Sequence, residues 1–223
     1  MIAEVAGTIG AGLKQALAEA PAAGLIAAGG TTAPPVLERL SALPLDWPRV
    51  WVTLSDERWV DARHEASNER MVRNTLLRGP AGAATFIPIY MEQDTPEAAE
   101  PLCHERLTAM PWSNSLCMLG MGTDGHVASL FPGTAALVDA LDLNYRRLCK
   151  AVYPKDSPIA GPHPRMSLTL AALTRARHIH LVITGAEKRA AFDRALSATD
   201  EREMPVRAVL NQSITPVGVY WAP

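Results

Sequence analysis

Short apolar runs alternate with longer amphipathic stretches along this chain. The short runs have the length of buried strands and lie at residues 25–28, 50–54, 86–89, 115–119, 148–153, 178–184 and 216–221. The longer stretches favour helices and lie at residues 3–20, 36–40, 67–78, 95–110 and 186–197. Strand–helix alternation of this kind predicts an α/β fold with a mostly parallel sheet and helices on both faces.

Cap and turn residues mark several element boundaries. Ser67 is a suitable N-cap for one helix, and Thr95-Pro96 opens another with proline in its first turn. The proline-rich stretch 154–164 interrupts the alternation, and we expect it to be a long surface loop near the functional site. Because composition does not shift along the chain, residues 1–223 are expected to form a single domain.

Composition excludes several classes of protein. With 48% hydrophobic and 20% charged residues the chain has the composition of a soluble globular protein, and its net charge of −2 gives no general attraction to nucleic acid or membrane. Three widely spaced cysteines, Cys103, Cys117 and Cys149, indicate neither a disulfide framework nor a metal site. No signal-peptide pattern and no apolar run of about 20 residues is present. A cytoplasmic enzyme or binding domain is expected.

The most informative segment is the glycine-rich turn after the strand at 115–119. Gly122 and Gly125 flank Asp124 there, and His126 follows directly. Strands that end in glycine turns place polar groups at the carboxyl edge of the sheet, where α/β proteins bind ligands. A lone histidine is more often structural, but one delivered to this edge is a candidate for proton transfer because its pKa lies near neutrality.

Another glycine loop, Gly29-Gly30-Thr31-Thr32, follows the strand at 25–28. The N-terminus of the next helix offers unpaired N–H groups and the positive end of its dipole, and the two hydroxyls add donors. The loop therefore suits a phosphate, although an ordinary glycine turn with a threonine cap would have the same sequence.

Charged residues follow two more strands. Asp56 and Arg58 come directly after the strand at 50–54, where Arg58 could bind an anion with two N–H groups and Asp56 could orient a group or accept a proton. A polar surface loop is the alternative, and Asn68 could cap a helix or contact a ligand. Lys188 opposes the dipole of the helix at 186–197, which a bound phosphate would reverse, although an exposed lysine also tolerates that position. Arg165 is a weaker candidate of the same kind.

The remaining histidines lack such a setting. His178 and His180 alternate along a strand, and no carboxylate or cysteine spacing beside them supports a metal. We expect them to be solvent-facing strand residues.

Together these motifs closely resemble the 6-phosphogluconolactonases of the glucosamine-6-phosphate isomerase/6-phosphogluconolactonase family. The motifs span nearly the whole chain in the order of that family; they are residues 29–32, 55–60, 67–68, 120–133, 165–169 and 185–188. The segment Gly125-His126 followed by Ser129-Leu130-Phe131-Pro132-Gly133 is highly specific. One departure is Thr-Thr-Ala-Pro at 31–34, where the family usually has Ser-Thr-Pro, so the start of the helix shifts by a residue.

The resemblance implies a carboxylic ester hydrolase that converts 6-phosphoglucono-1,5-lactone to 6-phosphogluconate in the oxidative pentose phosphate pathway. It implies the sugar-phosphate isomerase type of α/β fold, a small sugar-phosphate lactone as the ligand, and neither a metal nor an organic cofactor. We expect no nucleic-acid or membrane partner, and a monomer or a homodimer.

As a hypothesis, His126 takes a proton from the attacking water and returns it to the ring oxygen. Asp124 or Asp56 would hold the imidazole or substrate hydroxyls, and backbone N–H groups of the glycine turn are candidate oxyanion donors. The residues expected to bind the substrate and its phosphate are Gly29, Gly30, Thr31, Thr32, Arg58, Asn68, Gly122, Gly125, Arg165 and Lys188.

Two other functions fit parts of the pattern. An aldose–ketose isomerase or deaminase on the same fold would use Asp56 as a carbon base and would release ammonia from glucosamine 6-phosphate, but Arg58 and Ser129-Leu130-Phe131 argue against it. A sugar-phosphate sensor would bind without turnover, but it usually carries a DNA-binding or partner domain, for which this chain has neither the length nor a basic helix.

Overall fold

The computed structural model describes residues 1–154, 159–197 and 199–223. Its main sheet has the strand order β4-β2-β1-β5-β8-β9, and every pairing in it is parallel. Its strands are β1 (Ala23–Ala27), β2 (Val50–Leu54), β4 (Thr85–Phe86), β5 (Ser115–Leu119), β8 (His178–Thr184) and β9 (Val217–Ala222). The predicted α/β class with a mostly parallel sheet is confirmed.

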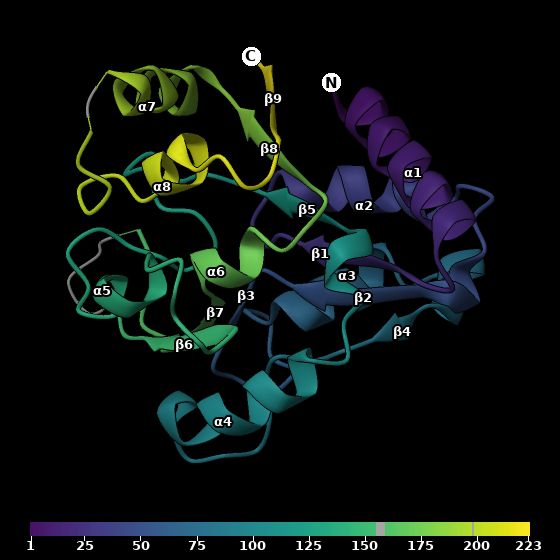
Figure 1. Cartoon of the computed structure of the whole chain (residues 1–223), viewed down its shortest axis with the longest axis horizontal. Helices are drawn as coiled ribbons and strands as arrows, with labels where there is room; N and C mark the ends of the chain where they lie inside the picture. The colour runs from purple at the N-terminus through teal and green to yellow at the C-terminus, as the bar shows by residue number, and fades with distance from the viewer. Residues whose placement is uncertain (155–158, 198) are drawn as a thin grey trace.

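Helices connect and cover these strands (Figure 1). They are α1 (Ile2–Glu19), α2 (Ala33–Ser41), α3 (Asn68–Thr75), α4 (Pro96–Leu107), α5 (Leu137–Ala140), α6 (Leu170–Leu173), α7 (Ala186–Leu196) and α8 (Val206–Asn211), with short 3₁₀ helices at Trp47–Arg49, Gly79–Ala83 and Trp112–Asn114. The step from β1 to β2 runs in the opposite direction along the sheet from the step from β8 to β9. Right-handed crossovers therefore place α2 and α7 on opposite faces.

The predicted element boundaries hold within a few residues. The strands at 50–54, 115–119 and 178–184 are confirmed as β2, β5 and β8. Ser67 and Thr95 are N-caps, as expected, because their hydroxyls accept hydrogen bonds from the backbone N–H groups of Arg70 and Ala98. The largest differences are at β4, which ends at Phe86, and at the short helices α5, α6 and α8, which the apolar pattern did not predict.

A second, antiparallel sheet was not predicted. It has the order β3-β7-β6, with β3 at Asp56–Arg58, β7 at Arg165–Leu168 and β6 at Cys149–Val152. For residues 55–60 a polar surface loop was only the alternative, and the segment contains β3. The strand predicted at 148–153 is confirmed as β6, but it lies in this second sheet rather than in the parallel one. The local sequence does not reveal β3, because this strand consists of three charged residues and forms by pairing with the edge of β7.

Most residues of the apolar runs are buried in the core. The three cysteines are free and buried as well. The expectation that His180 faces solvent is wrong, because the residue is only 3% exposed and its Nδ1 lies 3.2 Å from the hydroxyl of Tyr220.

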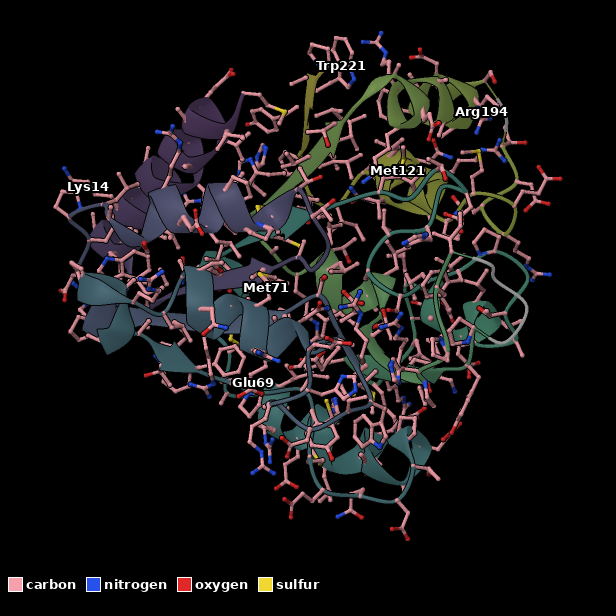
Figure 2. The ribbon with its side chains drawn as sticks, turned by 180° about the vertical axis from the view of Figure 1, so that it is seen from behind. Lys14, Glu69, Met71, Met121, Arg194 and Trp221 are labelled. Carbon is pink, nitrogen blue, oxygen red and sulfur yellow. The ribbon has the colours of Figure 1, made fainter. Side chains whose placement is uncertain are left out.

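Polar side chains lie on the outside of the molecule, where Lys14 projects from α1 (Figure 2). Within the described part of the chain, no helix is long and apolar enough to cross a membrane.

The predicted surface loop at 154–164 lies partly outside the described residues, which omit 155–158. On its described side, Ile159 and Ala160 line the cavity discussed below. This part of the loop is therefore near the site, as expected.

Candidate active site

A cavity of about 410 Å³ opens at the carboxyl ends of β1, β2, β5 and β8. Of the residues predicted for the site, all except Asp124 and Gly125 line it; they are Gly29, Gly30, Thr31, Thr32, Asp56, Arg58, Asn68, Gly122, His126, Arg165 and Lys188. These residues come from segments far apart in the sequence. The parallel sheet brings most of them together because its strands all end at this edge, and β7 of the second sheet contributes Arg165.

The turn after β5 is closed by its own backbone. The N–H of Gly122 donates to the carbonyl of His126 at 3.0 Å, and the N–H of Gly125 donates to the carbonyl of Gly122 at 3.0 Å. Gly125 has φ +80°, and a Cβ on Gly122 would lie 2.2 Å from His126 Nδ1. The N–H groups of these two glycines are thus occupied, so Gly122 and Gly125 shape the turn, while an oxyanion role for the other backbone N–H groups of the turn stays a prediction.

Asp124 holds the imidazole of His126. Its Oδ1 lies 2.6 Å from His126 Nδ1 and accepts a further hydrogen bond from the backbone N–H of His126 at 3.1 Å. Burial raises the pKa of Asp124, but the hydrogen bonds from His126 outweigh it, and the net pKa lies below its ordinary value. An ionised carboxylate can only accept, so Nδ1 carries the proton and the neutral ring keeps a lone pair on Nε2. The ring also packs on Phe131, with 4.4 Å between the centroids.

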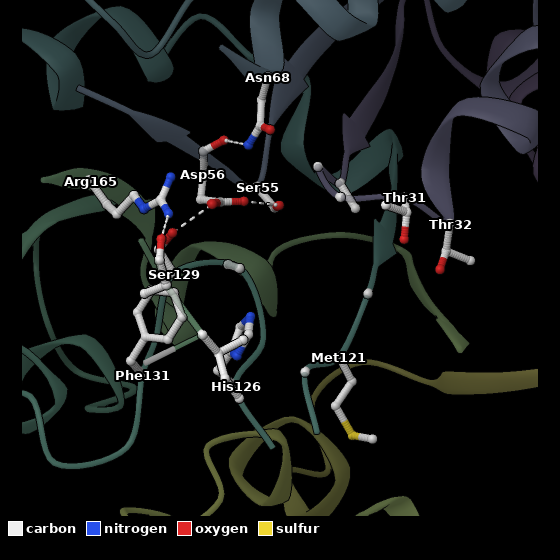
Figure 3. A pocket seen from close by; sticks show the side chains of 18 of the residues that line it. Thr31, Thr32, Ser55, Asp56, Asn68, Met121, His126, Ser129, Phe131 and Arg165 are labelled. Carbon is white, nitrogen blue, oxygen red and sulfur yellow. Dashed lines mark hydrogen bonds between the residues drawn. The ribbon is translucent and has the colours of Figure 1, made fainter. Parts of the chain in front are cut away.

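Asp56 contacts hydroxyl groups rather than the imidazole (Figure 3). The buried carboxylate accepts from the hydroxyl of Ser55 at 2.9 Å and from that of Ser129 at 2.5 Å. Its backbone carbonyl accepts from the side-chain amide of Asn68 at 2.9 Å. Of the two carboxylates considered for holding His126, the structure therefore assigns Asp124.

Two arginines lie side by side in the second sheet, because Arg58 of β3 pairs in register with Arg165 of β7. Arg58 Nη1 donates to the carbonyl of Ala66 at 2.7 Å and to Oδ1 of Asn68 at 2.9 Å. Asn68 therefore orients Arg58, and the residue that caps α3 is Ser67 rather than Asn68. Arg165 donates from Nη2 to the carbonyl of Ala160, but its Nε and Nη1 are buried and, within the described residues, have no partner.

This pairing of guanidinium groups is electrostatically unfavourable without an anion. Burial, and next the charge of Arg58, lower the pKa of Arg165 to about 10. A buried N–H without a partner costs about 1–3 kcal/mol, which a bound anion would offset. The arrangement therefore fits an anionic group.

The glycine–threonine loop and Lys188 line the same cavity. Helix α2 begins at Ala33, after Thr32 as its N-cap. Gly30 has φ +79°, and the Thr32 hydroxyl lies 3.3 Å from the hydroxyl of Thr184 at the end of β8. Burial lowers the pKa of Lys188, which is in the first turn of α7.

Two residues with clear roles were missed by the sequence reading. Glu57 is fully buried and accepts from the backbone N–H groups of Arg58, Asn68 and Glu69, each at 2.7 Å, so it ties the start of α3 to β3. Burial raises the pKa of Glu57 to about 7, while those N–H groups act in the other direction. Ser129 was quoted only as part of a motif, and nothing local indicates that its hydroxyl meets Asp56.

Metal binding was also considered. Among the residues that the structure describes, no group of three or more His, Cys, Asp or Glu side chains could hold a metal ion.

Known proteins resemble this chain in both sequence and fold. Residues 1–220 match the family model described as glucosamine-6-phosphate isomerases/6-phosphogluconolactonase. A 6-phosphogluconolactonase from Pseudomonas aeruginosa is 42% identical, covering 100% of this chain and 89% of the relative, and one from Rhizobium meliloti is 38% identical, covering 98% and 93%. The crystal structure of a 6-phosphogluconolactonase from Shewanella baltica superposes with a TM-score of 0.93 at 38% identity, covering 99% of this chain and 92% of that one.

Proposed function

The chain belongs to the glucosamine-6-phosphate isomerase/6-phosphogluconolactonase family, and from that premise we propose that it hydrolyses 6-phosphoglucono-1,5-lactone to 6-phosphogluconate in the oxidative pentose phosphate pathway. The observation that carries the proposal is the His126–Asp124 pair, 2.6 Å apart, at a cavity that also holds Arg58, Arg165 and Lys188. A proton acceptor and a cationic anchor are the two functions that this reaction needs.

His126 acts as the general base. Its Nε2 takes a proton from the water that attacks the C1 carbonyl, and the imidazolium then gives the proton to the ring oxygen as the C1–oxygen bond breaks. Asp124 keeps the ring in the tautomer that leaves Nε2 free, and its negative charge stabilises the imidazolium. General-base help of this kind contributes about 10²–10⁴-fold.

The cationic groups bind the phosphate. A phosphate monoester carries close to two negative charges at neutral pH. Its oxygens would accept hydrogen bonds from Nε and Nη1 of Arg165, which have no partner among the described residues. The loop at residues 29–32, which leads into the N-terminus of α2, and the ammonium of Lys188 add donors from the same cavity. With the phosphate fixed, the lactone carbonyl is positioned relative to His126.

The isomerase or deaminase alternative is less well supported. It requires Asp56 as a carbon base, but both oxygens of that carboxylate already accept hydrogen bonds from Ser55 and Ser129.

Lactone hydrolysis followed by continuous proton release, with the spontaneous rate subtracted, tests the proposal. We expect His126→Asn to lower kcat about 100-fold or more. His178→Asn, which changes a histidine at the opposite end of β8 from the cavity, should retain the activity. A His126→Asn variant as fast as the wild type would refute the mechanism, and ammonia release from glucosamine 6-phosphate would support the alternative.

A further inference from the structure

Asp56 lies on the same face of the second sheet as the two arginines. Asp56 pairs with Ser167 and Arg58 pairs with Arg165, so Asp56 and Arg165 are diagonal neighbours across β3 and β7. Diagonal neighbours in an antiparallel pair are within reach of long side chains, and opposite charges there attract. An unrestrained Asp56 carboxylate would therefore be expected to pair with Arg165.

That ion pair does not form. Ser55 donates to Oδ1 of Asp56 at 2.9 Å and Ser129 donates to Oδ2 at 2.5 Å, so each carboxylate oxygen already has a hydroxyl donor. Among the described residues, no carboxylate lies within 4.0 Å of the guanidinium nitrogens of Arg58 or Arg165. Arg165 keeps two buried N–H nitrogens without a partner. In Figure 3, Arg165 lies beside Asp56 and Ser129.

The position of Ser129 is fixed by its own surroundings. The residue is buried, and its backbone N–H donates to the hydroxyl of Ser167 at 3.2 Å. The preceding Ala128 has φ +50°, a left-handed conformation that a residue with a side chain rarely adopts. Such strain persists only where the surrounding structure requires it. Here the turn directs the Ser129 hydroxyl to Asp56.

We propose that Ser129, together with Ser55, is a positioning residue that keeps Asp56 out of an internal ion pair and so leaves Arg165 available to the anion of the substrate. This inference rests on the proposed function, in which Arg165 binds the phosphate. Without the Ser129 hydroxyl, Oδ2 of Asp56 is a buried acceptor without a donor, and the unpartnered N–H groups of Arg165 supply one. The phosphate must then displace that carboxylate.

The test is a titration of the full chain with inorganic phosphate, by calorimetry or ³¹P NMR. Because a hydrogen bond to a charged group is at stake, we expect Ser129→Ala to weaken phosphate binding on the order of tenfold. The same substitution in an Asp56→Asn background should have little effect, because a neutral amide makes no ion pair with Arg165. Ser115→Ala removes a buried hydroxyl at the start of β5, the end of that strand away from the cavity, and it should bind phosphate as the wild type does.

The outcomes separate this inference from the proposed function. It is overturned if Ser129→Ala binds within about twofold of the wild type, if the loss is the same in the Asp56→Asn background, or if Ser115→Ala loses as much. If Ser129→Ala does not fold, as judged by circular dichroism, Ser55→Ala takes its place with the same thresholds. If Arg165→Ala binds phosphate as tightly as the wild type, the phosphate site assigned in the proposed function is wrong, and the inference falls with it.

Discussion

Replacing Asp124 by asparagine tests the best-defined contact in the site. The amide keeps the size of the side chain but removes the negative charge from the group 2.6 Å from His126 Nδ1. A hydrogen bond between charged groups contributes about 1.5–3 kcal/mol. The imidazole and carboxylate side chains are 19% and 21% exposed, so solvent screening places the loss in the lower part of that range, at about 1.5–2 kcal/mol.

This loss should affect the transition state, in which the imidazolium forms, more than the bound substrate. We therefore expect kcat to fall about 10- to 30-fold with little change in KM. Because the pKa of Asp124 is below its ordinary value, its carboxylate is ionised throughout the neutral range in which the two enzymes are compared.

The assay is lactone hydrolysis by proton release, with Asp94→Asn, at an exposed acid outside the cavity, as the matched control. A kcat within about twofold of the wild type, or a change confined to KM, would refute the role given to Asp124.

Two further variants separate binding from chemistry. Lys188→Ala should raise KM about tenfold and leave kcat nearly unchanged, because it removes an anion anchor, whereas Lys14→Ala on the outer surface of α1 should change neither; a purely lowered kcat in Lys188→Ala would contradict its assignment. Gly122→Ala should lower kcat about 100-fold, because its Cβ would lie 2.2 Å from His126 Nδ1 and the ring must move. Gly7→Ala, with nothing within 4 Å of the added carbon, controls for the substitution itself, and equal losses in both glycine variants would argue against displacement of the ring.

The strands of the main sheet could be predicted because each of them overlaps a short run of mostly apolar residues. Runs such as 115–119 and 178–184 are mostly apolar and largely buried, since both faces of a parallel sheet are covered by helices. The apolar pattern does not record which strand pairs with which, so it could not show that the strand predicted at 148–153 belongs to a second, antiparallel sheet.

The short elements around the site lacked such a signal. Helices α5 and α6 have four residues each, too few for a helical period to be visible. Strand β3 reads as a polar loop because its residues are charged. It becomes a strand only because β7, more than 100 positions later in the sequence, supplies hydrogen-bond partners.

The sequence by itself determined the α/β class, the edge of the sheet at which the cavity opens, and most of the side chains that line the cavity, because strand ends and glycine turns are local features. Only the tertiary structure decided how those side chains are paired. In the folded chain Asp124 contacts His126, Ser129 donates a hydrogen bond to Asp56, and Arg58 lies next to Arg165. The Arg58–Arg165 contact depends on the register between two distant strands, and the Ser129–Asp56 contact depends on the conformation of the turn at Ala128. Neither the register nor the turn conformation can be read from the spacing of residues along one segment.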